Sequence, residues 1–154
     1  MLAARVPIET PADPFTDADT YYAGVKQYLA APEAQEMSES DLEREIQKRG
    51  QELLRQLLQA HLAARGPGDA VGPVHDAQGV ERPERRGHEH QLETVFGTVE
   101  VTRVGYGRTG EDSRHPLDGQ LNLPPERYSL EVRRRVAQEA ATRAFDEVCV
   151  YRPS

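Results

Sequence analysis

The sequence LETVFGTVEVTRV at residues 92–104 alternates apolar and polar residues on both sides of Gly97. A period of two places successive side chains on opposite faces of a β-strand. One face then carries Val99, Val101 and Arg103, and the other carries Thr98, Glu100, Thr102 and Val104. The pattern predicts an antiparallel hairpin with arms 92–96 and 98–104 around Gly97.

A two-stranded hairpin is only marginally stable in water, so this one needs a third strand or a covering helix. Gly79 and Val80 are predicted to begin a preceding strand that runs towards Arg86. After the hairpin, three glycines are expected to loosen the chain, namely Gly105, Gly107 and Gly110. Residues 115–125 then read as an extended loop, pinned by the apolar side chains Leu117, Leu121 and Leu123.

A long amphipathic helix is predicted before the hairpin, beginning at Ser38. Ser38 with Asp41, or Ser40 with Glu43, forms a capping-box pattern. The apolar stripe consists of Leu42, Ile46, Leu53, Leu54, Leu57, Leu58 and Leu62. At 1.5 Å per residue, roughly 25 residues span about 38 Å. Two interpretations stay open, because the stripe can pack within the chain or form a homodimer through residues 41–65.

A short helix is predicted upstream, capped by Thr16 or Asp17 and ended by Pro32. Its apolar and aromatic residues are Tyr21, Tyr22, Val25, Tyr28 and Leu29. Their spacing is typical of a helix that docks its tyrosines on the body of the protein. A stacking platform for bases is the alternative, but many acidic residues surround it.

A C-terminal helix is predicted to begin after the cap Ser129 and to expose Arg133, Arg134 and Arg135 in its first turns. Its predicted buried face consists of Val132, Val136, Ala137, Ala140, Ala141, Ala144, Phe145 and Val148. The last four residues, 151–154, show no helical pattern.

The expected fold class is therefore α+β: N-terminal helices, a small antiparallel hairpin or sheet, and a C-terminal helix. Five segments are expected along the chain. They are a flexible arm at 1–15, a helical segment at 16–65, a Gly/Pro-rich linker at 66–78, the hairpin plus C-terminal helix at 79–148, and an aberrant tail at 149–154.

The composition limits the possible functions. Among the 154 residues, 37% are apolar, below the roughly 45–50% of most globular domains. The net charge of -7 lies in residues 1–81, because residues 82–154 hold 12 arginines against 12 acidic residues. Such an acidic front repels phosphate. Neither a membrane span nor a secretory signal is recognisable, and the single cysteine, Cys149, cannot form an intrachain disulfide, so we expect a cytoplasmic protein.

No active site is expected from the residue pattern. His88, His90 and His115 could in principle form a metal site, but no Cys pair or HExxH pattern supports one. Turn and surface histidines are the favoured interpretation. Asp118 is the nearest candidate for metal-dependent phosphoryl transfer, and turn formation explains it better. The sequence therefore predicts no catalytic residue, metal, cofactor or small-molecule substrate.

Arginine is the residue type that best fits a binding role, because its guanidinium group bonds phosphate and guanine through two donors. The candidate DNA-binding residues are Arg85, Arg86, His88, Arg103, Arg108, Arg133, Arg134 and Arg135. The alternative is a solvated face in which these cations pair with Glu84, Glu89, Glu131 and Glu139.

Several ordered blocks of the sequence resemble the N-terminal region of ISKra-type insertion-sequence transposases. The resemblance covers roughly residues 45–147. Its blocks are GQELLRQLLQAHL (50–62), RGHE (86–89), LETVFGTVEVTR (92–103), Tyr106, HPLD (115–118), LNLP (121–124), ERYS (126–129), the following Arg-rich helix and FDE (145–147).

The resemblance implies cut-and-paste movement of DNA by an RNase H-like domain with acidic metal ligands. That domain follows this region in the family, so Mg²⁺ is implied only for it. The pattern departs after Glu147, which suggests a frameshifted or truncated copy, or a deliberately excised segment. The expected function is that of a non-catalytic transposase fragment that binds the transposon ends. The alternative is a helical dimerisation module with no nucleic-acid role.

Overall fold

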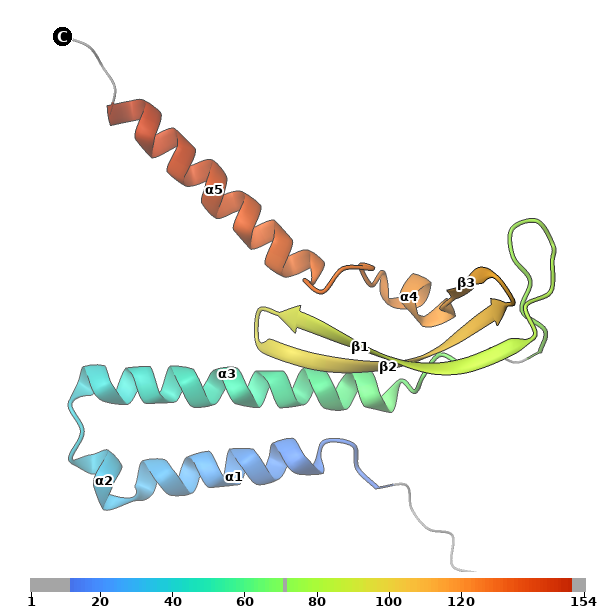
Figure 1. Cartoon of the computed structure of the whole chain (residues 1–154). Helices are drawn as coiled ribbons and strands as arrows, with labels where there is room; N and C mark the ends of the chain where they lie inside the picture. Colours follow the sequence, from blue (N-terminus) through green and yellow to red (C-terminus); the bar gives the residue numbers. More distant parts are fainter. Residues whose placement is uncertain (1–11, 71, 151–154) are drawn as a thin grey trace, which may run out of the picture.

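The computed structural model describes residues 12–70 and 72–150, and the side chains of its last helix as far as Arg143. This part contains five helices and one three-stranded antiparallel sheet, as expected for the α+β class (Figure 1). The elements are α1 (Thr16–Ala30), α2 (Pro32–Gln35), α3 (Glu39–Ala64), β1 (Glu84–Thr94), β2 (Gly97–Arg108), β3 (Glu111–Arg114), α4 (Pro116–Leu121) and α5 (Leu130–Val150).

The predicted flexible arm and tail fall largely outside the described residues, at 1–11 and 151–154. Helix α5 continues to Val150, two residues into the segment predicted as a tail. None of the helices in the described part is long and apolar enough to cross a membrane.

Helices α1 and α3 lie side by side and run in opposite directions, joined by the short α2 (Figure 1). The Ser38 cap is confirmed: its Oγ accepts from the Asp41 amide at 3.3 Å. The predicted cap of α1 is wrong, because Phe15 holds the N-cap position without a side-chain hydrogen bond and Asp13 organises the preceding turn. Pro32 follows the end of α1 and also begins α2.

The predicted docking of the tyrosines is partly confirmed. The Arg49 guanidinium group of α3 lies 3.6 Å from the centre of the half-buried Tyr28 ring. Such a cation–π contact stabilises the packing of α1 on α3. Tyr22 is exposed and has Lys26 of its own helix over its ring.

The hairpin is longer than the sequence indicated. Strand β1 pairs with β2 from Glu84↔Gly107 to Thr94↔Gly97, and Val95 and Phe96 form the turn. The predicted separate strand towards Arg86 is therefore wrong, because residues 84–86 belong to β1 itself. The extension shows no alternation of apolar residues, because its inner positions hold His88 and His90 on β1 and Gly105 and Gly107 on β2.

Gly105 and Gly107 do not loosen the chain as predicted, since both are buried inside β2. Gly105 provides room for side chains: a Cβ there would lie 2.8 Å from His115 Nε2 and 3.1 Å from His88 Nε2. Gly110 does form the turn between β2 and β3, with a φ of 84°. Two of the three glycines thus serve close packing rather than flexibility.

The outer edge of β2 is satisfied along most of its length, first by α3. The Gln59 amide both donates to the carbonyl and accepts from the amide of Glu100, each at 2.8 Å. One turn earlier Arg55 reaches the Thr98 carbonyl at 3.5 Å, and two turns earlier Gln51 donates to the Val95 carbonyl. Side chains of a helix thus replace the backbone of a neighbouring strand.

The rest of that edge is covered by the segment predicted as a linker and by β3. The Val104 amide donates to the Pro67 carbonyl at 2.9 Å, and β3 pairs from Tyr106 onwards. The Ala70 amide donates to the Tyr106 hydroxyl at 2.8 Å. Although its Gly/Pro composition is typical of a flexible linker, this segment packs on the sheet.

The prediction of an extended loop at 115–125 is also wrong, because Pro116–Leu121 forms α4. Proline at the first helical position has no amide that needs a partner, and Asn122 ends the helix in the left-handed region. The loop prediction did identify Leu117 as an apolar anchor, and this side chain is almost fully buried. The core consists of Ala18, Ala34, Leu92, Val99, Val101, Val104, Tyr106 and Leu117.

Helix α5 begins as predicted, with the Ser129 hydroxyl accepting from the Val132 amide at 3.2 Å. Its predicted buried face is wrong where it is described, because Val136, Ala137, Ala140 and Ala141 are exposed. Ala144, Phe145 and Val148 lie beyond the described side chains. Helix α5 extends away from the sheet and touches it only at its base, next to β1 (Figure 1).

Candidate nucleic-acid interface

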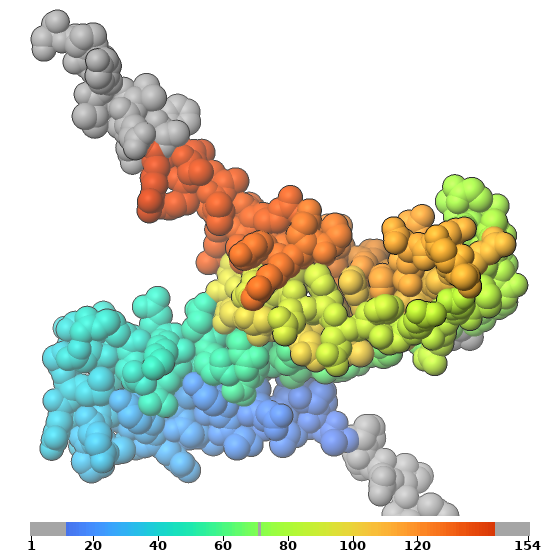
Figure 2. Space-filling model, in the orientation of Figure 1, coloured from blue at the N-terminus to red at the C-terminus, as the bar shows by residue number. Residues whose placement is uncertain are grey.

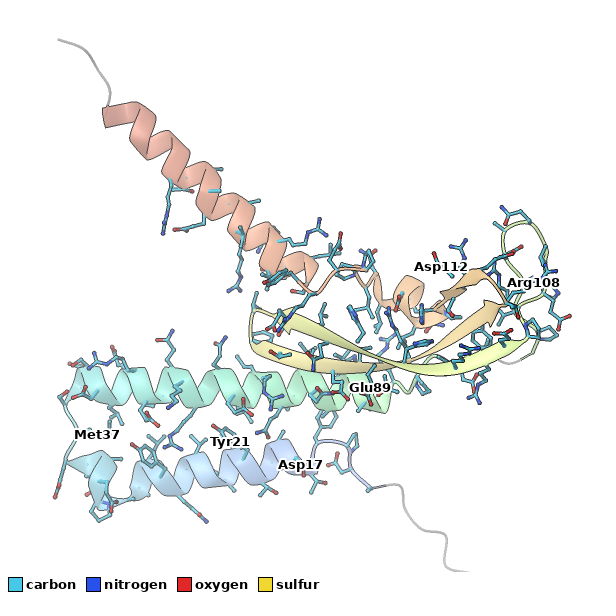
Figure 3. The ribbon with its side chains drawn as sticks, in the orientation of Figure 1. Asp17, Tyr21, Met37, Glu89, Arg108 and Asp112 are labelled. Carbon is cyan, nitrogen blue, oxygen red and sulfur yellow. The ribbon has the colours of Figure 1, made fainter. Side chains whose placement is uncertain are left out.

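The eight candidate residues do not gather on one surface. Arg85, Arg86 and His88 lie on β1, Arg103 and Arg108 on β2, and Arg133, Arg134 and Arg135 on α5. Arg108 is at the end of the sheet that lies opposite to the base of α5 (Figure 3). From Arg85 to Glu93, where β1 meets the base of α5, eight residues of strand span about 26 Å.

Arg103 and His88 are turned inwards. The Arg103 side chain is 14% exposed and forms an ion pair with Asp118 of α4. His88 is half-buried, with its ring 5.1 Å from that of His115 and nearly perpendicular to it. Arg103 borders an open hollow but is bound to Asp118, and the Nε2 atom of His88 is buried, so neither side chain is an exposed cation.

Arg85 and Arg86 are exposed but paired. Arg85 Nε donates to Asp69 at 3.0 Å, and the Tyr106 hydroxyl donates to the same carboxylate. The hydrogen bond from Tyr106 and the contact with Arg85 together lower the pKa of Asp69. Arg86 pairs with Glu84 at 3.1 Å. Solvated pairs of this kind contribute little to stability and can be exchanged for a phosphate.

The arginines of α5 form a second cluster. Glu131 accepts from Arg134 at 2.7 Å and from Arg135 at 3.1 Å, while Arg133 reaches Glu126 at 3.1 Å. The hydrogen bond from Arg134, followed in size by that from Arg135, lowers the pKa of Glu131 to about 2. The alternative interpretation, a solvated face of paired charges, is therefore correct at Glu131 and Glu84 in the protein without DNA.

Beyond its base, the described length of α5 stands clear of the body of the protein (Figure 2). Every residue from Arg133 to Arg143 is exposed, which leaves the sides of the helix open to a partner. Successive residues point 100° apart on a helix, so Arg133, Arg134 and Arg135 spread around α5 rather than along one stripe. This arrangement suits a groove or a crevice better than a flat surface.

Within residues 82–143, sequence reasoning missed three exposed arginines: Arg114, Arg127 and Arg143. Arg143, about two helical turns beyond Arg135, pairs with Glu139 at 3.0 Å. Arg127 pairs with Glu93 at 2.6 Å where the chain enters α5. Each stands alone in the sequence, and none lies on the predicted hairpin or in the first turns of the predicted C-terminal helix.

The interpretation of His88, His90 and His115 as turn and surface histidines is wrong. The first two lie inside β1 and the third precedes α4, and all three Nε2 atoms are buried without a hydrogen-bond partner among the described residues. Burial first, and then Arg103, lower the pKa of both His90 and His115. No three His, Cys, Asp or Glu side chains in the described ranges are arranged to hold a metal ion.

Asp118 has an arginine partner from the sheet. It lies in α4, not in the predicted turn, and accepts from Arg103. An open hollow of about 730 Å³ adjoins this pair and is lined by His75, Asp76, Arg114 and His115 among others. Comparisons with protein families, with curated proteins and with solved structures found no match for this chain.

Proposed function

We propose that this chain is a non-catalytic N-terminal part of an insertion-sequence transposase and that α5 contacts the DNA backbone at the transposon ends. The observation that carries the proposal is α5 itself, a helix that leaves the body and exposes four arginines, Arg133, Arg134, Arg135 and Arg143. The resemblance over residues 45–147 supplies the family, and Mg²⁺ enters only through the catalytic domain that the family implies.

The acidic balance of the whole chain does not oppose this role, because the net negative charge lies in residues 1–81. Phosphate recognition depends on local charge and geometry. On α5 the phosphates have to compete with Glu131 and Glu126 for the guanidinium groups. Since exposed ion pairs are individually weak, a polyanion with many phosphates displaces them readily.

Glu131→Gln is expected to strengthen DNA binding, because it removes the carboxylate that Arg134 and Arg135 share. Affinity is measured by gel shift at two salt concentrations, with a duplex of the transposon end and a scrambled duplex. We expect a several-fold gain in affinity for both duplexes.

The triple variant Arg133→Ala, Arg134→Ala, Arg135→Ala should weaken binding and reduce the salt slope by about 0.9 per lost phosphate contact.

Glu89→Gln is the matched control for the charge change. Glu89 is exposed on the sheet, away from the described length of α5 (Figure 3). An equal gain from Glu89→Gln and Glu131→Gln would reduce the effect to net charge. A triple arginine variant with unchanged affinity and salt slope would remove α5 from the interface.

A dimerisation module is the second candidate function, and one observation favours it. Helix α3 is 26 residues long, yet none of its residues is buried within the described part of the chain. Ile46, Leu54 and Leu57 are exposed on the side that faces neither α1 nor β2, and Gly50 lies among them with open space at its Cβ position. A second copy of α3 fits this face, because its glycine permits a close approach of helices.

Light scattering across a concentration series tests this candidate. We expect the wild-type mass to rise towards that of a dimer at micromolar concentrations, and Leu54→Asp to remain monomeric because it places a charge in the apolar contact. Val136→Asp, at an exposed position on α5, is the control. A monomer at high micromolar concentration would remove this candidate and leave the DNA-binding proposal untouched.

A further inference from the structure

A cluster of histidines lies between the sheet and α4. His88 and His90 come from β1, Arg103 from β2, and His115 and Asp118 from the start of α4. The rings of His88 and His115 meet above Gly105, where the missing side chain makes room for both. The cluster therefore forms part of the contact that holds α4 on the sheet.

In this contact, the imidazole nitrogens outnumber the hydrogen-bond acceptors that face them. Five polar atoms of the cluster are buried without a hydrogen-bond partner among the described residues: the Nε2 atoms of His88, His90 and His115, Arg103 Nε and Asp118 Oδ1. Arg103 already occupies the other oxygen of Asp118, which lies 3.9 Å from His115 Nδ1. A proton added to a histidine here places a positive charge beside Arg103, and the one carboxylate of the cluster, Asp118, is already paired with that arginine.

We propose that the histidine cluster is an acid-sensitive latch: protonation of His90 and His115 releases α4 from the sheet while the hairpin stays folded. The inference is independent of the proposed DNA-binding function. The release separates Arg103 from Asp118 and exposes more of the arginine side chain, which is 14% exposed while α4 is docked.

The charges around the cluster agree with this direction. On β1 they are His88 and His90, on β2 Arg103, and on α4 with its N-cap His115 and Asp118. Across the hollow lie His75, Asp76 and Arg114. Asp76 cannot serve as a counter-ion, because it already accepts from the backbone amides of Gln78 and Val80 and pairs with Arg82.

The pH window follows from the direction of the pKa shifts. Both histidines have a pKa below the ordinary 6.5 while α4 is docked, so the released state binds more protons. The docked state keeps its full stability above about pH 6.5 and loses it as the pH falls below that value. Each extra proton bound on release multiplies the opening equilibrium constant by up to about ten per pH unit.

Hydrogen exchange measured by NMR on the whole chain tests the latch. The reporters are the amides of Asp118 and Leu123, which bond within and just after α4. The Val99 amide lies between β1 and β2, opposite Leu92, and reports on the hairpin. Between pH 7.5 and pH 5, after correction for intrinsic exchange, we expect protection of the α4 amides to fall at least tenfold more than that of Val99.

Substitution of the titrating group is the second part of the experiment. His115→Phe keeps a ring of similar shape without a titratable nitrogen and should remove most of the acid sensitivity of α4. His61→Gln, on the exposed surface of α3, should leave the sensitivity unchanged. Should His115→Phe fail to fold, NMR titration of the wild-type imidazoles decides, since His90 and His115 must protonate together with the loss of α4 protection. Retained α4 protection at pH 5, or protonation of both histidines without it being lost, would overturn the proposal.

Discussion

Replacing Arg82 with alanine is expected to lower the free energy of unfolding by about 3 kcal/mol. Arg82 is the one charged residue among the fully buried residues of the described chain. It pairs with Asp76 at 3.1 Å and with Glu111 at 2.5 Å, and it donates to the Asp112 carbonyl at 3.2 Å. Its removal leaves the buried Asp76 without its cation and detaches β3 from the loop before β1.

Urea denaturation followed by circular dichroism measures this loss. The control is Arg127→Ala, which also deletes an arginine paired with a glutamate, but one whose side chain is 63% exposed. Screening by water makes such a pair weak, so the control midpoint should hardly move. Equal midpoints for Arg82→Ala and the wild type would show that the buried network around Arg82 does not stabilise the fold.

The second large effect is expected for Leu117→Ala, at about 2–5 kcal/mol. Leu117 has the most deeply buried large side chain of α4, at 1% exposure. It packs against the Gly68 backbone so closely that a Cβ on Gly68 would lie 2.6 Å from Leu117 Cβ. Truncation leaves a cavity between α4 and the segment that covers the edge of β2, and neither backbone can collapse into it without losing hydrogen bonds.

Thermal melts of Leu117→Ala and of Val136→Ala separate burial from mere loss of apolar volume. Val136 is 62% exposed on α5, so its truncation should change the melting temperature little. For a chain of this length, we expect Leu117→Ala to lower the melting temperature by roughly 5–15 °C. A small shift would indicate that α4 contributes little to the cooperative core.

The sequence was sufficient to predict those elements whose signals are local. Each of these signals lies within a few neighbouring residues. They are the caps at Ser38 and Ser129 and the alternation around Val99 and Val101, and all are confirmed. The extension of β1 was missed because its inner face is built from His88, which lies over Gly105 of β2, and from His90 rather than from apolar residues. Helix α4 was missed because its few residues carry no periodic pattern.

The candidate interface was harder to predict, because residue type alone does not reveal which carboxylate pairs with which arginine. Arg103 looked like an exposed cation of a strand, but its partner Asp118 arrives from a helix fifteen residues further along the chain. Arg85 likewise meets Asp69 from the segment taken for a linker. Tertiary contacts of this kind decide which arginines remain available, and a run such as Arg133–Arg135 stays accessible only because α5 leaves the body.

Three side chains of α3 bond the edge of the hairpin, and each is called a rung here: Gln51, Arg55 and Gln59. Their spacing limits which changes of sequence this protein can tolerate. Four helical residues advance about 6.0 Å while two strand residues advance about 6.7 Å, and each helical step turns a further 40° away from the strand. The two periods therefore coincide for only a few rungs, which explains why the series ends at Gln59 and backbone from Pro67 takes over. A one-residue insertion between Gln51 and Gln59 would swing the later rungs off the edge together, so α3 should tolerate substitutions far better than changes of length.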